Sequence, residues 1–134
     1  LGVITRRDIL EKMSREQVSS LPTFSDQIAQ KLVQNANGFS FTVEPFMLEN
    51  NGVLSHGVLT EILNTATHQL VASNGRSLII EQMMIYFLQA VQLDDYLTLT
   101  SRVVHETRRS AIIDYDVYLD HQLVAKATMT VKIN

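Results

Sequence analysis

The chain has 134 residues, of which 46% are hydrophobic and 19% charged, so it can bury one core of ordinary size but not a second full domain. Its formal charge of −3 gives no broad basic surface and disfavours nucleic acid as a partner. The absence of cysteine excludes disulfides, thiolate chemistry and cysteine-based zinc sites.

No apolar run approaches the roughly 20 residues that a membrane-spanning helix needs, and no signal peptide is visible. We therefore expect a cytoplasmic protein that does not enter a membrane, and the lack of cysteine fits a reducing compartment. Because the chain begins at Leu1, we also expect it to be a fragment of a longer protein.

The first predicted elements are a short buried strand and an amphipathic helix capped by Thr5, both within residues 1–13. Residues 2–10 read Gly-Val-Ile-Thr-Arg-Arg-Asp-Ile-Leu. This run resembles the closing strand and helix of a CBS domain, where the threonine and aspartate commonly meet a nucleotide ribose. The resemblance implies a C-terminal CBS remnant and an adenine nucleotide bound further upstream. An ordinary capped helix would have the same pattern.

Residues 14–38 are interpreted as a helical connector without a binding role. Thr23 and Asp26 stand at capping-box spacing, which predicts a helix over about 25–36. Gly38 suits the left-handed position that often follows a helix.

Residues 39–134 predict one α+β domain. A strand over about 39–48, interrupted by Pro45, precedes an amphipathic helix over about 53–73 and a turn at residues 74–75. The remaining chain has the patterns of β-strands. One long helix against a strongly curved antiparallel sheet of about five strands would bury the apolar faces of both.

Three strand patterns in the second half support this interpretation. Residues 78–88 contain the continuous apolar run 83–88, as expected of a central strand covered on both faces. Residues 113–120 and 123–133 instead alternate apolar and polar side chains, so each predicted strand has one face in the core. Residues 120–122 are the expected hairpin turn, although it contains no glycine.

Four local motifs recur in one order along this domain. Asn50 precedes His56-Gly57 by six residues, at the start of the predicted long helix. The others are a strand-turn-strand at 87–97, the turn Thr107-Arg108-Arg109-Ser110 and a last strand at 123–130. Together they resemble the hot-dog-fold acyl-CoA thioesterases over residues 39–134, and imply a long helix wrapped by a curved sheet.

The start of the long helix is the candidate catalytic site. Free N–H groups and the positive end of the helix dipole suit a carbonyl oxygen that gains negative charge. By resemblance, the Gly57 N–H holds this oxygen, Asn50 and His56 orient water or the thioester, and the neighbouring Asn51 contacts substrate. The alternative is that His56 caps the helix and Gly57 accommodates packing.

The general base is where the chain departs from the family. One large branch carries an acid nine residues after the histidine, where this chain has Thr65. Glu61 is the nearest acid and a candidate base, with Thr65 positioning water; a solvated Glu61 is the alternative. His68 shares their helix face, but one histidine and one carboxylate do not predict a metal site.

Two further groups are candidates for substrate binding. Arg108 and Arg109, with Ser110 beside them, stand at a predicted turn where guanidinium groups can grip the phosphates of coenzyme A. Met83 and Met84, with neighbouring aromatic residues, could line an acyl tunnel. Solvated charges and core packing are the respective alternatives.

The predicted function is hydrolysis of an acyl-CoA thioester, under control of upstream CBS modules and without a further cofactor. Family sites form between two subunits, so the resemblance implies a homo-oligomer, at least a dimer. A non-catalytic acyl-CoA sensor is the main alternative, because the expected acid is missing. A pure dimerisation module, with its pocket filled by its own side chains, is the third.

Overall fold

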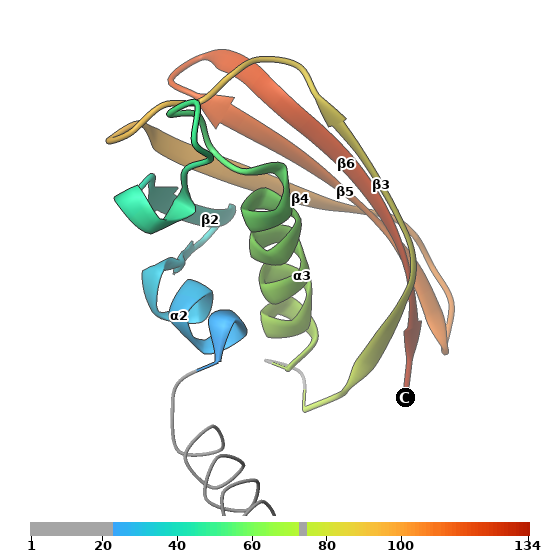
Figure 1. The fold of residues 1–134 in the computed structure, drawn as a ribbon. Coiled ribbons are helices and arrows are strands. Elements are labelled where there is room, and N and C mark those ends of the chain that lie inside the picture. Colours follow the sequence, from blue (N-terminus) through green and yellow to red (C-terminus); the bar gives the residue numbers. More distant parts are fainter. Residues whose placement is uncertain (1–22, 73–74) are drawn as a thin grey trace, which may run out of the picture.

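The computed structural model describes residues 23–72 and 75–134 (Figure 1). The predicted CBS remnant, residues 1–13, lies outside the described residues, as does the first part of the connector. The described elements are α2 (Phe24–Lys31), β1 (Val33–Asn35), β2 (Gly38–Thr42), the 3-10 helix η1 (Pro45–Met47), α3 (His56–Ala72), β3 (Leu78–Phe87), β4 (Tyr96–Glu106), β5 (Ser110–Leu119) and β6 (Gln122–Ile133).

The strands form one curved antiparallel sheet in the order β1-β2-β4-β5-β6-β3. Figure 1 shows α3 in the hollow of this sheet, with α2 beside it. The α+β class is confirmed, but the described sheet has six strands instead of about five. The additional strand is β1, which was assigned to the connector helix. Neither described helix is long and apolar enough to cross a membrane.

The connector contains the predicted capping box. The Thr23 side chain accepts from the Asp26 N–H at 3.1 Å, and the Asp26 carboxylate accepts from the Thr23 N–H at 3.0 Å. The helix ends at Lys31 because the chain becomes extended at Leu32 and pairs as β1. Gly38 therefore does not end a helix. It begins β2, where any Cβ would collide with the backbone carbonyl of the facing strand β4.

The predicted long strand over 39–48 is shorter, because β2 ends at Thr42 and Pro45 opens η1. Proline fixes φ near −65° and lacks an N–H, which suits the first residue of a helical turn.

The core lies between α3 and the concave face of the sheet. The alternation predicted for β5 and β6 is confirmed: Tyr115 and Val117 are fully buried, as are Ala127 and Met129 on the next strand. The hairpin between them turns at residues 120–121, with Asp120 supplying the positive φ that glycine often provides. A register shift after Val117 turns both Val124 and Ala125 inward at the start of β6.

The prediction that β3 is a central strand is wrong. It pairs with β6 on one side, and within the described residues no strand pairs with its other side. Ile79, Met84 and Tyr86 are about half exposed on it. An apolar run indicates that both faces of a strand are uncharged. It does not indicate whether other strands pair with both of its edges.

Candidate functional site

The N-terminus of α3 presents an open backbone donor. Ser55 precedes the helix and its hydroxyl accepts from the Val58 N–H at 3.4 Å, which caps the first turn. In the part of the chain that the structure describes, the Gly57 N–H donates to no other group. A Cβ on Gly57 would meet the Ser55 hydroxyl oxygen alone, at an ordinary 3.6 Å. Packing within the protomer thus does not require glycine, and its missing side chain keeps the N–H open to a ligand.

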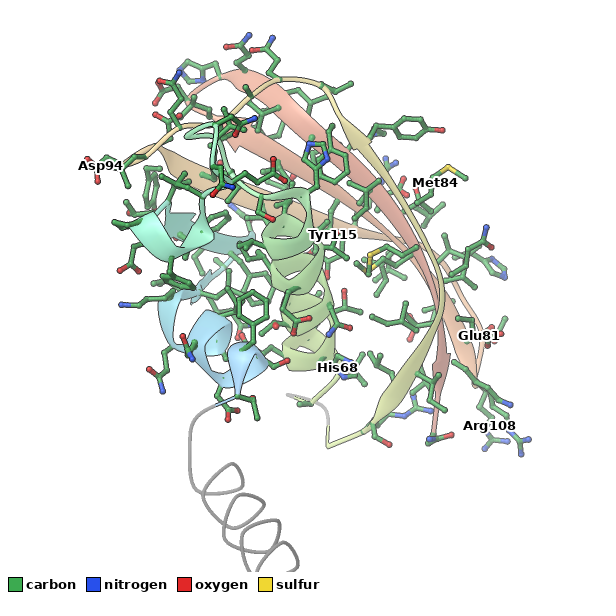
Figure 2. The ribbon with its side chains drawn as sticks, in the orientation of Figure 1. His68, Glu81, Met84, Asp94, Arg108 and Tyr115 are labelled. Carbon is green, nitrogen blue, oxygen red and sulfur yellow. The ribbon has the colours of Figure 1, made fainter. Side chains whose placement is uncertain are left out.

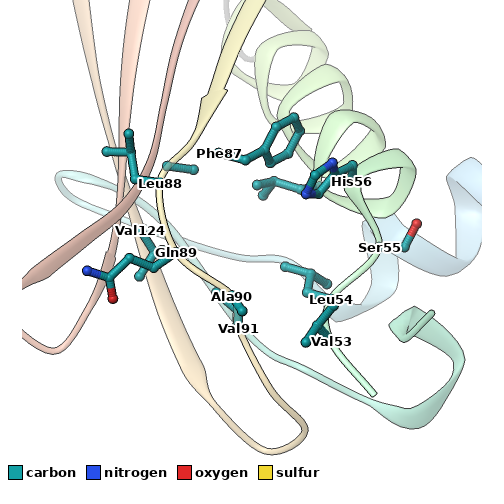
Figure 3. A pocket seen from close by; sticks show the side chains of 12 residues that line it. Val53, Leu54, Ser55, His56, Phe87, Leu88, Gln89, Ala90, Val91 and Val124 are labelled. Carbon is teal, nitrogen blue, oxygen red and sulfur yellow. The ribbon is translucent and has the colours of Figure 1, made fainter. Parts of the chain in front are cut away.

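A cavity of about 230 Å³ lies beside this helix turn (Figure 3). Three segments enclose it: the chain that enters α3 with its first turn, the end of β3 with the loop after it, and the start of β6. Their lining residues are Val53, Leu54, Ser55, His56, Leu59, Phe87, Leu88, Gln89, Ala90, Val91, Val124 and Ala125. The cavity is therefore apolar except for the serine, the histidine and the glutamine.

His56 stands at the rim of the cavity and stacks against Phe87. The two ring centroids are 3.7 Å apart and the ring planes differ by 10°. Figure 3 shows the two rings side by side above the apolar lining. The stack fixes the orientation of the imidazole, while its nitrogens stay available because the side chain is exposed.

Asn50 and Asn51 lie in the turn that leads toward α3, and neither lines the cavity. The turn is closed by a hydrogen bond of 2.8 Å from the Glu49 N–H to the Val53 carbonyl. The Asn51 side-chain oxygen accepts from the Val53 N–H at 3.2 Å, so Asn51 stabilises the turn itself.

Glu61 and Thr65 lie on a different face of α3 from His56. Five residues along a helix rotate a side chain by about 140°. Glu61 therefore faces α2, where its Oε1 accepts from the Ser25 hydroxyl at 2.6 Å and from the Thr65 hydroxyl at 3.4 Å. Both residues line a separate polar cavity between the two helices, together with His68. One protomer thus does not bring its candidate base to the cavity beside His56.

The other candidate substrate contacts also lie away from this cavity. Met83 is half-buried against the core and Met84 is exposed on β3. Arg108 and Arg109 form the β4–β5 turn at the far end of the sheet (Figure 2). Ser110 pairs with Lys132, seven residues along β6 from the cavity-lining Ala125, which is about 24 Å along a strand.

Sequence reasoning missed the loop and the β6 residues that close the cavity. Residues 88–91 are predicted as part of a strand-turn-strand motif, and Val124 and Ala125 as part of the last strand, without a binding role. Their signal in the sequence is weak, because small apolar residues line cores and cavities alike. Across residues 23–72 and 75–134, no three histidine, aspartate or glutamate side chains gather to hold a metal ion.

The family model described as the thioesterase superfamily matches residues 51–126, more than half of the chain, from the turn before α3 to the first part of β6. The chain belongs to the thioesterase superfamily. Its helix in a curved antiparallel sheet is the hot-dog fold of that superfamily.

Solved structures agree with this assignment. A hypothetical thioesterase protein from Streptococcus pneumoniae TIGR4, solved with coenzyme A, is 26% identical, with a TM-score of 0.69 over 77% of this chain and 86% of that one. The smu.793 protein of Streptococcus mutans UA159, bound to acetyl CoA, is 25% identical, with a TM-score of 0.69 over 78% and 87%. The conserved protein PA5202 of Pseudomonas aeruginosa shares the fold, at 22% identity and a TM-score of 0.73 over 90% and 99%.

A curated relative, the uncharacterized protein YtoI of Bacillus subtilis (strain 168), is 26% identical over 99% of this thioesterase-superfamily chain. The match spans 32% of the length of that relative, so this chain corresponds to about a third of it.

Proposed function

We propose that this thioesterase-superfamily domain hydrolyses an acyl-CoA thioester in the cavity beside His56. The observation that carries the proposal is an apolar cavity lined by His56 and Leu59 of the first turn of α3, in which the Gly57 N–H has no partner among the described residues. This arrangement suits a thioester whose carbonyl oxygen points at the helix and whose acyl group enters the cavity. The coenzyme A and acetyl CoA of the two streptococcal structures support the ligand class.

In this reaction the Gly57 N–H and the helix dipole stabilise negative charge on the carbonyl oxygen. Water attacks the carbonyl carbon, the C–S bond breaks, and the products are a carboxylic acid and the thiol of coenzyme A. His56 and Asn50 orient the water or the thioester, with Asn51 as a further contact. Glu61 accepts the proton of the water and Thr65 positions it.

A homodimer joined through β3 would place these roles in one site. The open edge of β3 carries unpaired backbone groups and exposed apolar side chains, which together favour pairing with another strand. Two copies related by a two-fold axis pair this strand antiparallel, so the Leu78 end of one copy lies beside the Phe87 end of the other.

Pairing of this kind brings the far end of one sheet toward the other copy's cavity. Arg108, Arg109 and Ser110 lie at that far end, where guanidinium groups can bind the phosphates of coenzyme A. Met83 and Met84 lie on the joining strand itself, so they would contact the part of the acyl-CoA that lies outside the cavity. Glu61 and Thr65 would act at the partner's cavity instead of their own.

The alternative is a sensor that binds acyl-CoA without cleaving it. Thr65 stands where one branch of the family has an acid, and the nearest carboxylate, Glu61, already accepts from Ser25 at 2.6 Å. Both observations favour binding without turnover. The open cavity argues against the third candidate, a dimerisation module whose pocket is filled by its own side chains.

The domain arrangement belongs to the same proposal: a CBS remnant at 1–13, a connector at 14–38 and the thioesterase-like domain at 39–134, in the cytoplasm. Upstream CBS modules would bind an adenine nucleotide and control the domain through the connector. The test is coenzyme A release by the full-length protein with and without AMP or ATP. A rate indifferent to both nucleotides rules out this control.

Hydrolysis and sensing are separated by measuring coenzyme A release from acyl-CoAs of varied chain length, with thermal shift on the same samples. In an enzyme, His56→Ala and Glu61→Ala lose turnover while the fold is kept. The matched controls are His105→Ala and Glu44→Ala, which change residues outside both cavities and off β3. Stabilisation by acyl-CoA without release identifies a sensor, and no response to any acyl-CoA overturns both functions.

A further inference from the structure

The cavity beside His56 has a buried lining that is wholly apolar and an exposed lining that includes two polar side chains. The exposed lining consists of His56 and Gln89 together with the apolar residues Phe87, Leu88 and Ala90. The buried lining, or inner end, is formed by five apolar side chains, each less than a tenth exposed: Leu54, Leu59, Val91, Val124 and Ala125. Such a shape fits a ligand with a polar reacting group at the rim and an apolar tail inside.

The lining contains no aspartate, glutamate, lysine or arginine. A carboxylate or ammonium group at the end of the tail would lose its hydration in this cavity without gaining a partner. Charged acyl groups, such as the half-thioester of a dicarboxylic acid, are therefore poor ligands.

The volume of the cavity limits the size of the tail. An apolar cavity of about 150 Å³ in a protein core accepts benzene, with its six carbons. With the same number of carbon atoms per unit of volume, the cavity of about 230 Å³ holds about nine carbons. Its outer part is open to solvent, so the tail that fills its closed part is shorter.

We infer that the acyl group taken by this site is uncharged and of medium length, about six to nine carbons. The inference rests on the proposed function, because it assumes that the thioester lies at the Gly57 N–H. Ala125 faces the inner end of the cavity from β6, where a larger side chain would shorten the space available to the tail.

The test uses alkyl thioethers of coenzyme A, which cannot be hydrolysed, with saturated chains from two to sixteen carbons. Burying one methylene improves affinity about fourfold, so affinity should rise by that factor per carbon until the cavity is full. We expect the rise to stop at about eight carbons. A thioether of similar length that ends in a carboxylate should bind at least about tenfold more weakly.

A matched pair of variants locates the inner end of the tail. Ala125→Val reduces the space by two methyl groups and should move the end of the rise about two carbons shorter. Ala127→Val is the control, since Ala127 is equally buried on the same face of β6 but does not line the cavity. The readout is the ratio of the affinities for two chain lengths, so a loss of stability that both variants share does not change it.

The outcomes separate this inference from the proposed function. If coenzyme A and all its thioethers bind with equal affinity, the cavity does not bind the acyl tail, but the protein still binds coenzyme A. An affinity that keeps rising up to sixteen carbons also overturns the inference. So does an Ala127→Val variant in which the rise in affinity ends as early as in Ala125→Val. No binding of any coenzyme A derivative overturns the proposed function, and the inference with it.

Discussion

The Ser25 hydroxyl donates a hydrogen bond of 2.6 Å to the Glu61 carboxylate, joining two helices across 36 positions of sequence. Ile28, one turn further along α2, is 1% exposed, so the same helix also contributes to the core. The connector therefore packs on the face of α3 that carries the candidate base. A displacement of α2 relative to α3 would therefore change this contact.

We expect Glu61→Gln to separate a catalytic from a structural role. Glutamine keeps the size and the hydrogen bond to Ser25 but cannot accept a proton, so a base role predicts at least about a hundredfold loss of coenzyme A release. Ser25→Ala removes one hydrogen bond and should lower the free energy of unfolding by about 1 kcal/mol, with a smaller effect on rate. Glu44→Gln is the control, since Glu44 lies outside both cavities and off β3. Full turnover by Glu61→Gln would remove Glu61 from the mechanism.

Gly57→Ala should lose ligand binding without losing stability. The added methyl group has an ordinary contact distance of 3.6 Å to the Ser55 hydroxyl, and alanine in a helical conformation stabilises by about 0.4 to 1 kcal/mol. The same methyl group covers the approach to the backbone N–H. Thermal unfolding together with coenzyme A binding checks both effects. An alanine variant that binds as well as the wild type would exclude this N–H as the oxygen-binding donor.

Local sequence patterns predicted the elements well where the deciding interactions are local. The capping box of Thr23 and Asp26 lies within one helix turn, and the alternation of residues 113–119 reflects a single strand with one buried face. Neither feature depends on distant parts of the chain. The long helix was likewise predicted from its own apolar stripe, within three residues of its observed start.

The incorrect predictions concern positions set by distant partners. Among the described strands, β3 pairs only with β6 and so lies at the edge of the sheet, and an apolar run does not contain that information. Residues 33–35 became a strand because β2 offered a free edge. The distance between Glu61 and the cavity follows from the side of α3 on which α2 packs. The motif spacing placed His56 at the helix start but did not show which face Glu61 occupies.

The buried pair Tyr115 and Thr67 predicts a specific loss of stability in alkali. Their hydroxyl oxygens are 2.8 Å apart in the core, and both side chains are fully buried. Burial raises the pKa of Tyr115 from 10.0 to about 12, an effect that the hydrogen bond to Thr67 partly offsets. The folded protein thus holds this proton more tightly than the unfolded chain.

The stability linked to this proton is complete below pH 10 and is lost as the pH rises from 10 to about 12. The loss amounts to about 3 kcal/mol. Tyr115→Phe should remove this pH dependence, at a cost of about 1 kcal/mol at neutral pH for the lost hydrogen bond. Denaturant unfolding across this pH range checks it. Tyr96→Phe changes an exposed tyrosine, so its unfolding free energy should fall with pH as that of the wild type does. If the unfolding free energy of Tyr115→Phe falls in parallel with both, Tyr115 is not the group that titrates.

Pairing of two copies through β3 predicts that one charge on this strand will separate them. Met84 is 47% exposed on β3, and Met84→Lys would place like charges near each other across the two-fold axis and put a lysine on the open edge. Leu93→Lys is the control, since Leu93 is 42% exposed in the turn after β3.

We expect light scattering to show a dimer for the wild type and Leu93→Lys, and a monomer for Met84→Lys. Coenzyme A release should fall with the dimer fraction, because the monomer does not bring Glu61 to the cavity beside His56. If Met84→Lys stays dimeric, the interface lies elsewhere. If the monomer keeps full activity, the site is complete within one protomer, and the base is then a residue near His56 and not Glu61.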